Sequence, residues 1–266
     1  MDQDLGAAGL RFEREGVIGW CIIDRPEARN ALTGAMYYGI KKAVLRVDND
    51  PDLAALIITG TGDVFAPGGD LGGREPDPRD APTPEVGSGE SLPFKAIRES
   101  RKPVIAAVNG ICQGGGLLIA MMADIAVVSD QATFRVPELL RGIIDATYAY
   151  TLPAHVGLAV ARDLLVSARR FGAREALAYG LISRVVPHDE LREASLAAAG
   201  EVLQTAPLAR MHVKRMLNER YGQIDYTTMM WGLAESPEPR EGFTAFMEKR
   251  APSWIPAQFV GNTGRR

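Results

Sequence analysis

The chain has 266 residues, a length that fits one large domain with a modest appendage and allows a substantial buried core. Hydrophobic residues make up 46% and charged residues 24%, which is ordinary for a globular protein and excludes a wholly disordered chain. The 30 basic and 33 acidic residues give a formal net charge of −3, so the sequence lacks the basic signature of nucleic-acid binding.

The two cysteines predict neither a disulfide framework nor a metal site. Cys21 lies in an apolar run and Cys112 in a glycine-rich turn, which is typical of a protein from a reducing compartment. The first residues lack a basic segment followed by an apolar core, and no apolar run of about 18 residues occurs. We therefore expect a soluble, cytoplasmic protein that makes no membrane contact.

The first half of the chain predicts strands around one long helix. Residues 11–24 hold two β-rich pieces on either side of Gly16, which predicts a hairpin that leads into a buried strand. Between residues 31 and 47 apolar side chains recur every three to four positions, the spacing of one helix face. The apolar runs 53–60 and 103–110 read as buried strands, and each is followed by a glycine-rich loop.

The middle of the chain continues to alternate between strand and helix. Residues 72–92, rich in Pro, Gly and charge, predict a mobile loop rather than one long helix. Beyond the second glycine-rich loop we expect an apolar helix over 117–123, a strand over 123–130, and a strand over 133–140 that turns at Pro137. This alternation predicts an α/β core with much parallel strand pairing.

From about Pro187 the pattern becomes purely helical. The expected helices cover residues 188–204, 208–221, 226–236 and 241–250. Their apolar faces are rich in Met, Leu and Phe, so they pack on the core or between subunits. The change in pattern predicts a core over residues 1–198 and a helical C-terminal region over 199–266.

Two glycine-rich loops are candidate anion sites. The first, FAPGGDL (65–71), follows a strand and lets backbone N–H groups approach a ligand without a Cβ in the way. The second, NGICQGGG (109–116), opens an apolar helix whose first N–H groups carry a partial positive charge. For the first loop a tight turn is the commoner explanation, and for the second loop close packing of helix on strand explains the glycines equally well. Neither loop matches a dinucleotide or Walker fingerprint.

Two carboxylates are candidates for proton transfer. Glu138 follows Pro137 at the end of an otherwise apolar strand, where desolvation raises a carboxyl pKa toward the range of a general base. A strand-end glutamate that faces water is the alternative. Asp145 also lies among apolar residues, but capping of the following helix is a commoner role for such an aspartate than catalysis.

Six segments, taken in order, resemble the enoyl-CoA hydratase/isomerase family, the crotonases. They are RPEARNAL (25–32), ITGTGDVFAPGGDL (58–71), KPVIAAVNGICQGGGLLIAMMADI (102–125), FRVPEL (134–139), GLISRVVP (180–187) and FMEKR (246–250). The resemblance covers nearly the whole chain, and its motifs are specific in combination. It implies an α/β fold built as a crotonase-like spiral of ββα units, with a helical C-terminal region that drives assembly into a homotrimer or a dimer of trimers.

The resemblance also implies an oxyanion hole made of backbone. In it, the N–H groups of Gly69 and Gly115 hold the thioester oxygen of an acyl-CoA, and coenzyme A is part of the substrate. No permanently bound cofactor and no metal are implied. The positions that match the family's coenzyme A contacts, the last two supplied by a neighbouring subunit, are Arg25, Ala28, Pro67, Gly68, Asp70, Leu71, Phe246 and Lys249.

One departure from the family pattern affects the expected reaction. Family hydratases place and activate water with two glutamates; Glu138 matches the second, but Leu118 stands at the position of the first. Leucine neither holds water nor accepts a proton. A single base suffices for an enoyl-CoA isomerase, because it removes a proton from one carbon and returns it two carbons along. Asp145 aligns, after a one-residue gap, near the aspartate of dienoyl-CoA isomerases.

We therefore expect an acyl-CoA enzyme of isomerase type with Glu138 as its base and Asp145 as a possible second group. Three alternatives stay open. The chain is a hydratase that converts 2-enoyl-CoA and water to 3-hydroxyacyl-CoA, or it catalyses another crotonase reaction such as dienoyl-CoA isomerisation, C–C hydrolysis or decarboxylation. The third alternative is a catalytically weak acyl-CoA-binding oligomer, against which Glu138 argues. Neither a nucleic acid nor a membrane is an expected partner.

Overall fold

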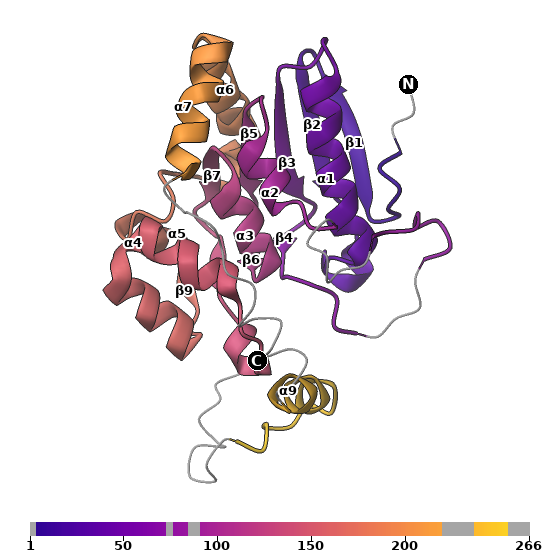
Figure 1. The fold of residues 1–266 in the computed structure, drawn as a ribbon, viewed down its shortest axis with the longest axis vertical. Helices are drawn as coiled ribbons and strands as arrows, with labels where there is room; N and C mark the ends of the chain where they lie inside the picture. Colours follow the sequence, from indigo (N-terminus) through magenta and orange to yellow (C-terminus); the bar gives the residue numbers. More distant parts are fainter. Residues whose placement is uncertain (1–3, 73–76, 85–90, 220–236, 255–266) are drawn as a thin grey trace. The chain divides into compact units, whose positions relative to one another are not determined.

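A computed structural model of the chain describes residues 4–72, 77–84, 91–219 and 237–254 (Figure 1). The chain divides into two compact units that are interleaved along the sequence. The first unit comprises Met1–Asp70, Arg74–Arg135 and Arg170–Gly222, and the second comprises Leu71–Gly73, Val136–Arg169 and Gln223–Arg266. The predicted division between residues 198 and 199 stays a prediction.

A six-stranded sheet forms the centre of the first unit (Figure 1). Its strands, in spatial order, are β1 (Leu10–Glu15), β2 (Ile18–Ile23), β3 (Ala55–Gly60), β5 (Val104–Val108), β7 (Ile125–Ser129) and β10 (Arg184–Val186). The first two form the predicted antiparallel hairpin, and Gly16 in its turn has a φ of 59°, which glycine adopts without strain. All the other pairs are parallel, as the alternation of strand and helix predicted.

A second, smaller sheet in the same unit explains the repeating architecture. Its order is β4 (Val64–Ala66), β6 (Ile111–Gln113), β8 (Thr133–Arg135) and β9 (Phe171–Gly172). The chain passes from β3 to β4, from β5 to β6 and from β7 to β8, one strand in each sheet. The first two of these pairs are followed by helices α2 (Phe94–Glu99) and α3 (Gly115–Met122). The result is a series of ββα units.

The remaining helices of the first unit are placed by their apolar faces. They are α1 (Gly34–Asn49), α5 (Ala173–Ala178), α6 (Leu191–Leu203) and α7 (Pro207–Glu219), with the short 3-10 helices η1 (Pro26–Ala28) and η4 (His188–Glu190). Helix α1 begins after Thr33, whose side chain accepts a hydrogen bond from the N–H of Met36 at 3.1 Å. Helix α6 packs Leu191, Ala198 and Ala199 against the larger sheet. Complete burial of a large apolar side chain stabilises the fold by about 1.5–3 kcal/mol.

The second unit contains η3 (Glu138–Arg141), α4 (Ala146–Ser167) and α9 (Glu238–Met247). The strand expected from residue 133 and the turn expected at Pro137 are both present, but the strand already ends at Arg135, and the prediction that Glu138 ends a strand is wrong because Glu138 begins a 3-10 turn. The physical reason is Pro137, which has no N–H for the strand ladder and here adopts a ψ of 1°. The helix predicted over 226–236 lies outside the described residues, as does part of 72–92.

Two further predictions concern membranes and metals. Within residues 4–72, 77–84, 91–219 and 237–254, no helix is long and apolar enough to cross a membrane. The same ranges contain no group of three or more His, Cys, Asp or Glu side chains arranged to hold a metal ion.

Candidate active site

The first glycine-rich loop is tied to the start of α1 by a short parallel bridge. The Leu32 N–H donates to the Gly68 carbonyl and the Asp70 N–H donates to the Leu32 carbonyl, both at 2.9 Å. Because successive backbone groups of an extended segment point to opposite sides, the N–H of Gly69 is turned away from Leu32. Among the described residues none accepts a hydrogen bond from it, and Gly69 is exposed.

In the part of the chain that the structure describes, the second loop supplies another N–H group without a hydrogen-bond partner. Gly114 precedes α3 with a φ of 51° and a ψ of −129°, a conformation that residues with a Cβ rarely adopt. Gly115 is the first residue of α3, so its N–H is one of the helix donors that have no partner inside the helix. No acceptor for this N–H is found in the described part of the chain.

The two loops touch, and their glycines have different reasons to lack side chains. A Cβ on Gly68 would lie 3.6 Å from the backbone nitrogen of Gly115, so the first loop passes directly beside the second donor. A Cβ on Gly116 would lie 2.8 Å from the Cβ of Ala66, which confirms that close packing of helix on strand is one role of this loop. Gly69 and Gly115 therefore lie in adjacent loops of one unit.

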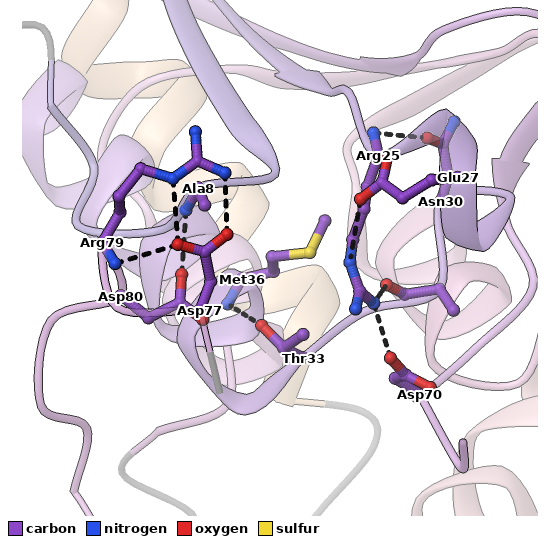
Figure 2. A network of polar contacts seen from close by, with 11 residues as sticks. Ala8, Arg25, Glu27, Asn30, Thr33, Met36, Asp70, Asp77, Arg79 and Asp80 are labelled. Carbon is purple, nitrogen blue, oxygen red and sulfur yellow. Dashed lines mark hydrogen bonds and ion pairs between the residues drawn. The ribbon is translucent and has the colours of Figure 1, made fainter. Parts of the chain in front are cut away.

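A part-buried ion pair holds the RPEARN segment against the first loop. Arg25 donates to the carboxylate of Asp70 at 2.6 Å and to the Ala31 carbonyl at 2.9 Å, and Figure 2 shows its guanidinium directed at Asp70. The two side chains are only 14% and 13% exposed. Arg25 and Asp70, both predicted as coenzyme A contacts, thus bond to each other, and Asp70 directly follows the donor Gly69.

Asn30 ties the same segment to the chain before the loop. Its side chain accepts the Arg25 N–H at 2.9 Å and donates to the Val64 carbonyl at 2.6 Å and the Thr61 carbonyl at 3.1 Å. Asn30 is 1% exposed and has a φ of 60°, a left-handed conformation that asparagine tolerates better than most residues. The RPEARN segment is therefore part of the frame of the glycine loops. The other predicted contacts here, Ala28, Pro67 and Leu71, are half-buried.

Glu138 carries an unusual carboxyl group in the second unit. The residue as a whole is half-buried, but its Oε2 atom is sealed from solvent and has no hydrogen-bond partner among the described residues. Burial, and to a smaller extent the nearby carboxylate of Asp145, raise the pKa of this carboxyl from 4.5 to about 8. A carboxyl with this pKa exchanges a proton near neutral pH, which suits a general acid–base group.

Asp145 caps α4. Its side chain accepts the Tyr148 N–H at 3.1 Å, which confirms the capping role that the sequence left open. Burial raises the pKa of the Asp145 carboxyl, against the lowering effect of hydrogen bonds from Tyr148 and Thr147. Since its charge also raises the Glu138 pKa, Asp145 affects the proton affinity of the candidate base. A direct catalytic role for Asp145 stays a prediction.

Helix α9 packs closely on the turn that bears Glu138. A Cβ on Gly142 would lie 2.6 Å from the backbone of Glu238, and the ring of Phe246 lies 4.7 Å from the Arg141 guanidinium. Phe246 therefore contacts η3 of its own chain, while Lys249 is exposed just after the helix. The predicted contacts of Phe246 and Lys249 with coenzyme A from a neighbouring subunit stay predictions.

Comparison with known proteins identifies a common family. A family model described as enoyl-CoA hydratase/isomerase matches residues 13–256. A protein named carnitinyl-CoA dehydratase from Proteus mirabilis (strain HI4320) is 34% identical over 257 residues, which cover 92% of this chain and 97% of the relative.

Solved structures agree with the sequence comparison. An enoyl-CoA hydratase/isomerase from Pseudoalteromonas atlantica T6c superposes with a TM-score of 0.78 at 32% identity, covering 93% of this chain and 100% of that one. A carnitinyl-CoA hydratase from Mycobacterium avium gives a TM-score of 0.76 at 31% identity, covering 92% and 98%. The predicted crotonase-type α/β fold is thereby confirmed.

Proposed function

Because this chain belongs to the enoyl-CoA hydratase/isomerase family, we propose that it polarises an acyl-CoA thioester with the N–H groups of Gly69 and Gly115 and moves a proton with Glu138. The observation that carries the proposal is a pair of N–H groups in two touching loops, neither of which has an acceptor among the described residues. Family enzymes act on coenzyme A thioesters, and coenzyme A enters as part of the substrate. Assembly into a trimer or hexamer and a cytoplasmic location stay predictions.

The two donors lower the energy of an enolate. When a proton leaves the carbon next to the thioester, the electron pair moves onto the carbonyl oxygen, and this oxygen gains negative charge. Donors that are already aimed at this oxygen stabilise the enolate without reorganising, and the loss of one such donor costs about 3 kcal/mol in comparable sites. Arg25 and Asp70 contribute by fixing the loop that carries Gly69.

We assign isomerisation as the leading reaction, since Leu118 leaves one evident carboxyl base. In a 3-enoyl-CoA, the Glu138 carboxylate takes a proton from C2, the electrons move to the thioester oxygen, and a dienolate forms. The protonated Glu138 then returns the proton to C4, which leaves the double bond between C2 and C3. One group thus completes the cycle, and a pKa of about 8 lets it both accept and release the proton.

A second candidate is dehydration or hydration, which the names of the relatives favour. In dehydration of a 3-hydroxyacyl-CoA, Glu138 removes the C2 proton and delivers it to the departing C3 hydroxyl, so that water and a 2-enoyl-CoA result. The same carboxyl acts as base and then as acid. Leu118 stands where family hydratases have another glutamate. This reaction is therefore harder to catalyse, because the family pattern offers no other group to hold the water.

A panel of acyl-CoA thioesters incubated in D2O and read by mass spectrometry tests the proposal. The panel contains 3-enoyl, 2-enoyl and 3-hydroxyacyl thioesters of several chain lengths. We expect 3-enoyl thioesters to give 2-enoyl products with deuterium in the acyl chain. Gain or loss of water would favour the second candidate. Failure of every thioester to react or to exchange its C2 protons would contradict the proposal as a whole.

Replacing Leu118 by Glu distinguishes the two candidates. Leu118 is 2% exposed in α3, so the new carboxyl is costly to bury and the variant is expected to be less stable. We expect hydration of crotonyl-CoA to rise above that of the wild type, because a second carboxyl can hold the attacking water. Leu117→Glu, at a site 1% exposed on the same helix, is the matched control and should lose stability without gaining hydration. A folded Leu118→Glu variant without any gain would mean that something other than the missing carboxyl limits hydration.

A further inference from the structure

Tyr37, on the first turn of α1, places a phenol hydroxyl beside both candidate thioester donors. A Cβ on Gly115 would overlap the Tyr37 hydroxyl oxygen and would lie 2.8 Å from the ring carbon that bears it. A Cβ on Gly69 would lie 3.8 Å from the same hydroxyl oxygen. The Tyr37 hydroxyl therefore takes the place of a side chain at Gly115 and stands within contact range of Gly69.

The surroundings of Tyr37 hold this hydroxyl in place. The Tyr37 N–H donates to the Thr33 carbonyl at 3.0 Å in the first turn of the helix, directly after the Leu32 bridge to the Gly69 loop. Its ring meets the Phe94 ring edge to face, with the centroids 6.1 Å apart and the planes at 72°. The bridge that positions the Gly69 N–H thus also positions the helix turn that carries Tyr37.

The contact with Tyr37 gives a reason why residue 115 is a glycine. Its neighbour Gly116 is needed for close packing against Ala66, but the space that a side chain at Gly115 would fill is taken by a polar group. A hydroxyl carries one O–H donor, and a hydrogen bond to a charged oxygen is about twice as strong as one between neutral groups. The loop therefore presents two backbone donors and leaves room for one hydroxyl next to them.

We propose that Tyr37 is a further catalytic residue, whose hydroxyl donates a third hydrogen bond to the thioester oxygen held by Gly69 and Gly115. This inference rests on the proposed function, because it needs a thioester oxygen at these two glycines. The third donor stabilises the negative charge of the enolate more than the neutral thioester, so it acts on the rate of proton removal rather than on binding.

Tyr37→Phe tests the inference, with Tyr38→Phe as the matched control. Phenylalanine keeps the ring that contacts Phe94 and removes only the hydroxyl, while Tyr38 lies on the same helix turn with its ring near Lys41 and Lys42. The first readout is the exchange of the C2 protons of butyryl-CoA in D2O. We expect the exchange rate to fall by about 10²-fold in Tyr37→Phe, with unchanged butyryl-CoA affinity, and to stay at the wild-type level in Tyr38→Phe.

The second readout is the infrared carbonyl stretch of bound crotonyl-CoA that carries ¹³C at C1. Each hydrogen bond to the carbonyl lowers its frequency, so Tyr37→Phe should show a smaller shift on binding than the wild type. If the wild type itself shows no shift, the two-glycine site is wrong. If the wild type shifts and Tyr37→Phe shifts equally, with equal exchange rates, only the Tyr37 inference is overturned.

A third variant covers the case in which Tyr37→Phe does not fold. Difluorotyrosine introduced at position 37 keeps the ring and the hydroxyl but makes the O–H a stronger donor. A carbonyl shift larger than that of the wild type supports the inference. An unchanged shift contradicts it.

Discussion

Replacement of Glu138 by Gln is expected to lower turnover by about 10³-fold while acyl-CoA binding stays nearly unchanged. Gln has almost the same shape, so it preserves the 3-10 turn and its packing with α9. It cannot accept a proton, and Glu138 is the one carboxyl that the family pattern leaves in a catalytic position. Steady-state kinetics on a substrate found in the panel, with a binding titration of the same thioester, gives both quantities. Unchanged turnover in the folded variant would rule out Glu138 as the base.

The pKa of Glu138 determines how the wild type responds to pH. As a base the carboxyl must be ionised, so kcat/KM should rise about tenfold per pH unit and level off above a pH of about 8. Asp145→Asn keeps a residue able to cap α4 but removes the charge that raises the Glu138 pKa, so this rise should move to lower pH. If Asp145 itself transfers the proton, this variant loses activity at every pH.

The Glu138 carboxyl also makes the free energy of unfolding depend on pH: activity should rise with pH, whereas stability should fall. Its pKa is raised from 4.5 to about 8 in the folded state, so between these values the folded chain binds a proton that the unfolded chain has released. The free energy of unfolding therefore falls as pH rises through this range, and above it this contribution is lost. Glu138→Gln lacks the titration, so its stability relative to the wild type should increase from about pH 5 to about pH 9 in urea unfolding. A constant difference would mean that the carboxyl is not desolvated.

Breaking the Arg25–Asp70 pair is expected to produce the largest loss of stability at the candidate site. Arg25→Met removes the cation that bonds to the part-buried Asp70 carboxylate, and we expect a loss of about 3 kcal/mol, the lower end of the range for a fully buried pair. Because Asp70 follows Gly69 and bonds to Leu32 through its backbone, we also expect turnover to fall. Urea unfolding gives the first quantity and steady-state kinetics the second.

A surface pair and a double variant provide the controls. Arg184 and Glu201 form an ion pair of similar length, 2.7 Å, but their side chains are 35% and 60% exposed, so Arg184→Met should cost only about 1 kcal/mol or less. The double variant Arg25→Met with Asp70→Leu removes both charges and should recover part of the lost stability. Equal losses in Arg25→Met and Arg184→Met would show that the pair contributes nothing beyond a surface contact.

Local sequence patterns correctly predicted most of the framework. The hairpin around Gly16, the long helix α1 and the buried strands β3, β5 and β7 all follow from periodicity and turn residues, because those signals act within a few residues. The sequence also indicated the two glycine loops as candidate donor sites, and that assignment stays a prediction. The order of the motifs along the chain also identified the family and its α/β fold.

Other features were beyond the reach of the sequence. Glu138 was placed at the end of a strand, since the apolar run around it was read as continuing past Pro137. The pairing of Arg25 with Asp70 and the position of the Tyr37 hydroxyl beside Gly115 had no local signal at all. In the periodicity of α1, Tyr37 is simply one more position on a helix.

The amino-acid sequence by itself indicated which backbone N–H groups are candidate donors, because glycine lets a backbone N–H approach a ligand and the first N–H groups of a helix have no partner inside it. Only the tertiary structure decided what surrounds these donors. Residues 25 and 70, or 37 and 115, meet because parallel strands bring distant loops to one edge of the sheets, and no pattern within either segment encodes that approach. The proton affinity of Glu138 likewise depends on burial and on Asp145, which a folded chain alone provides.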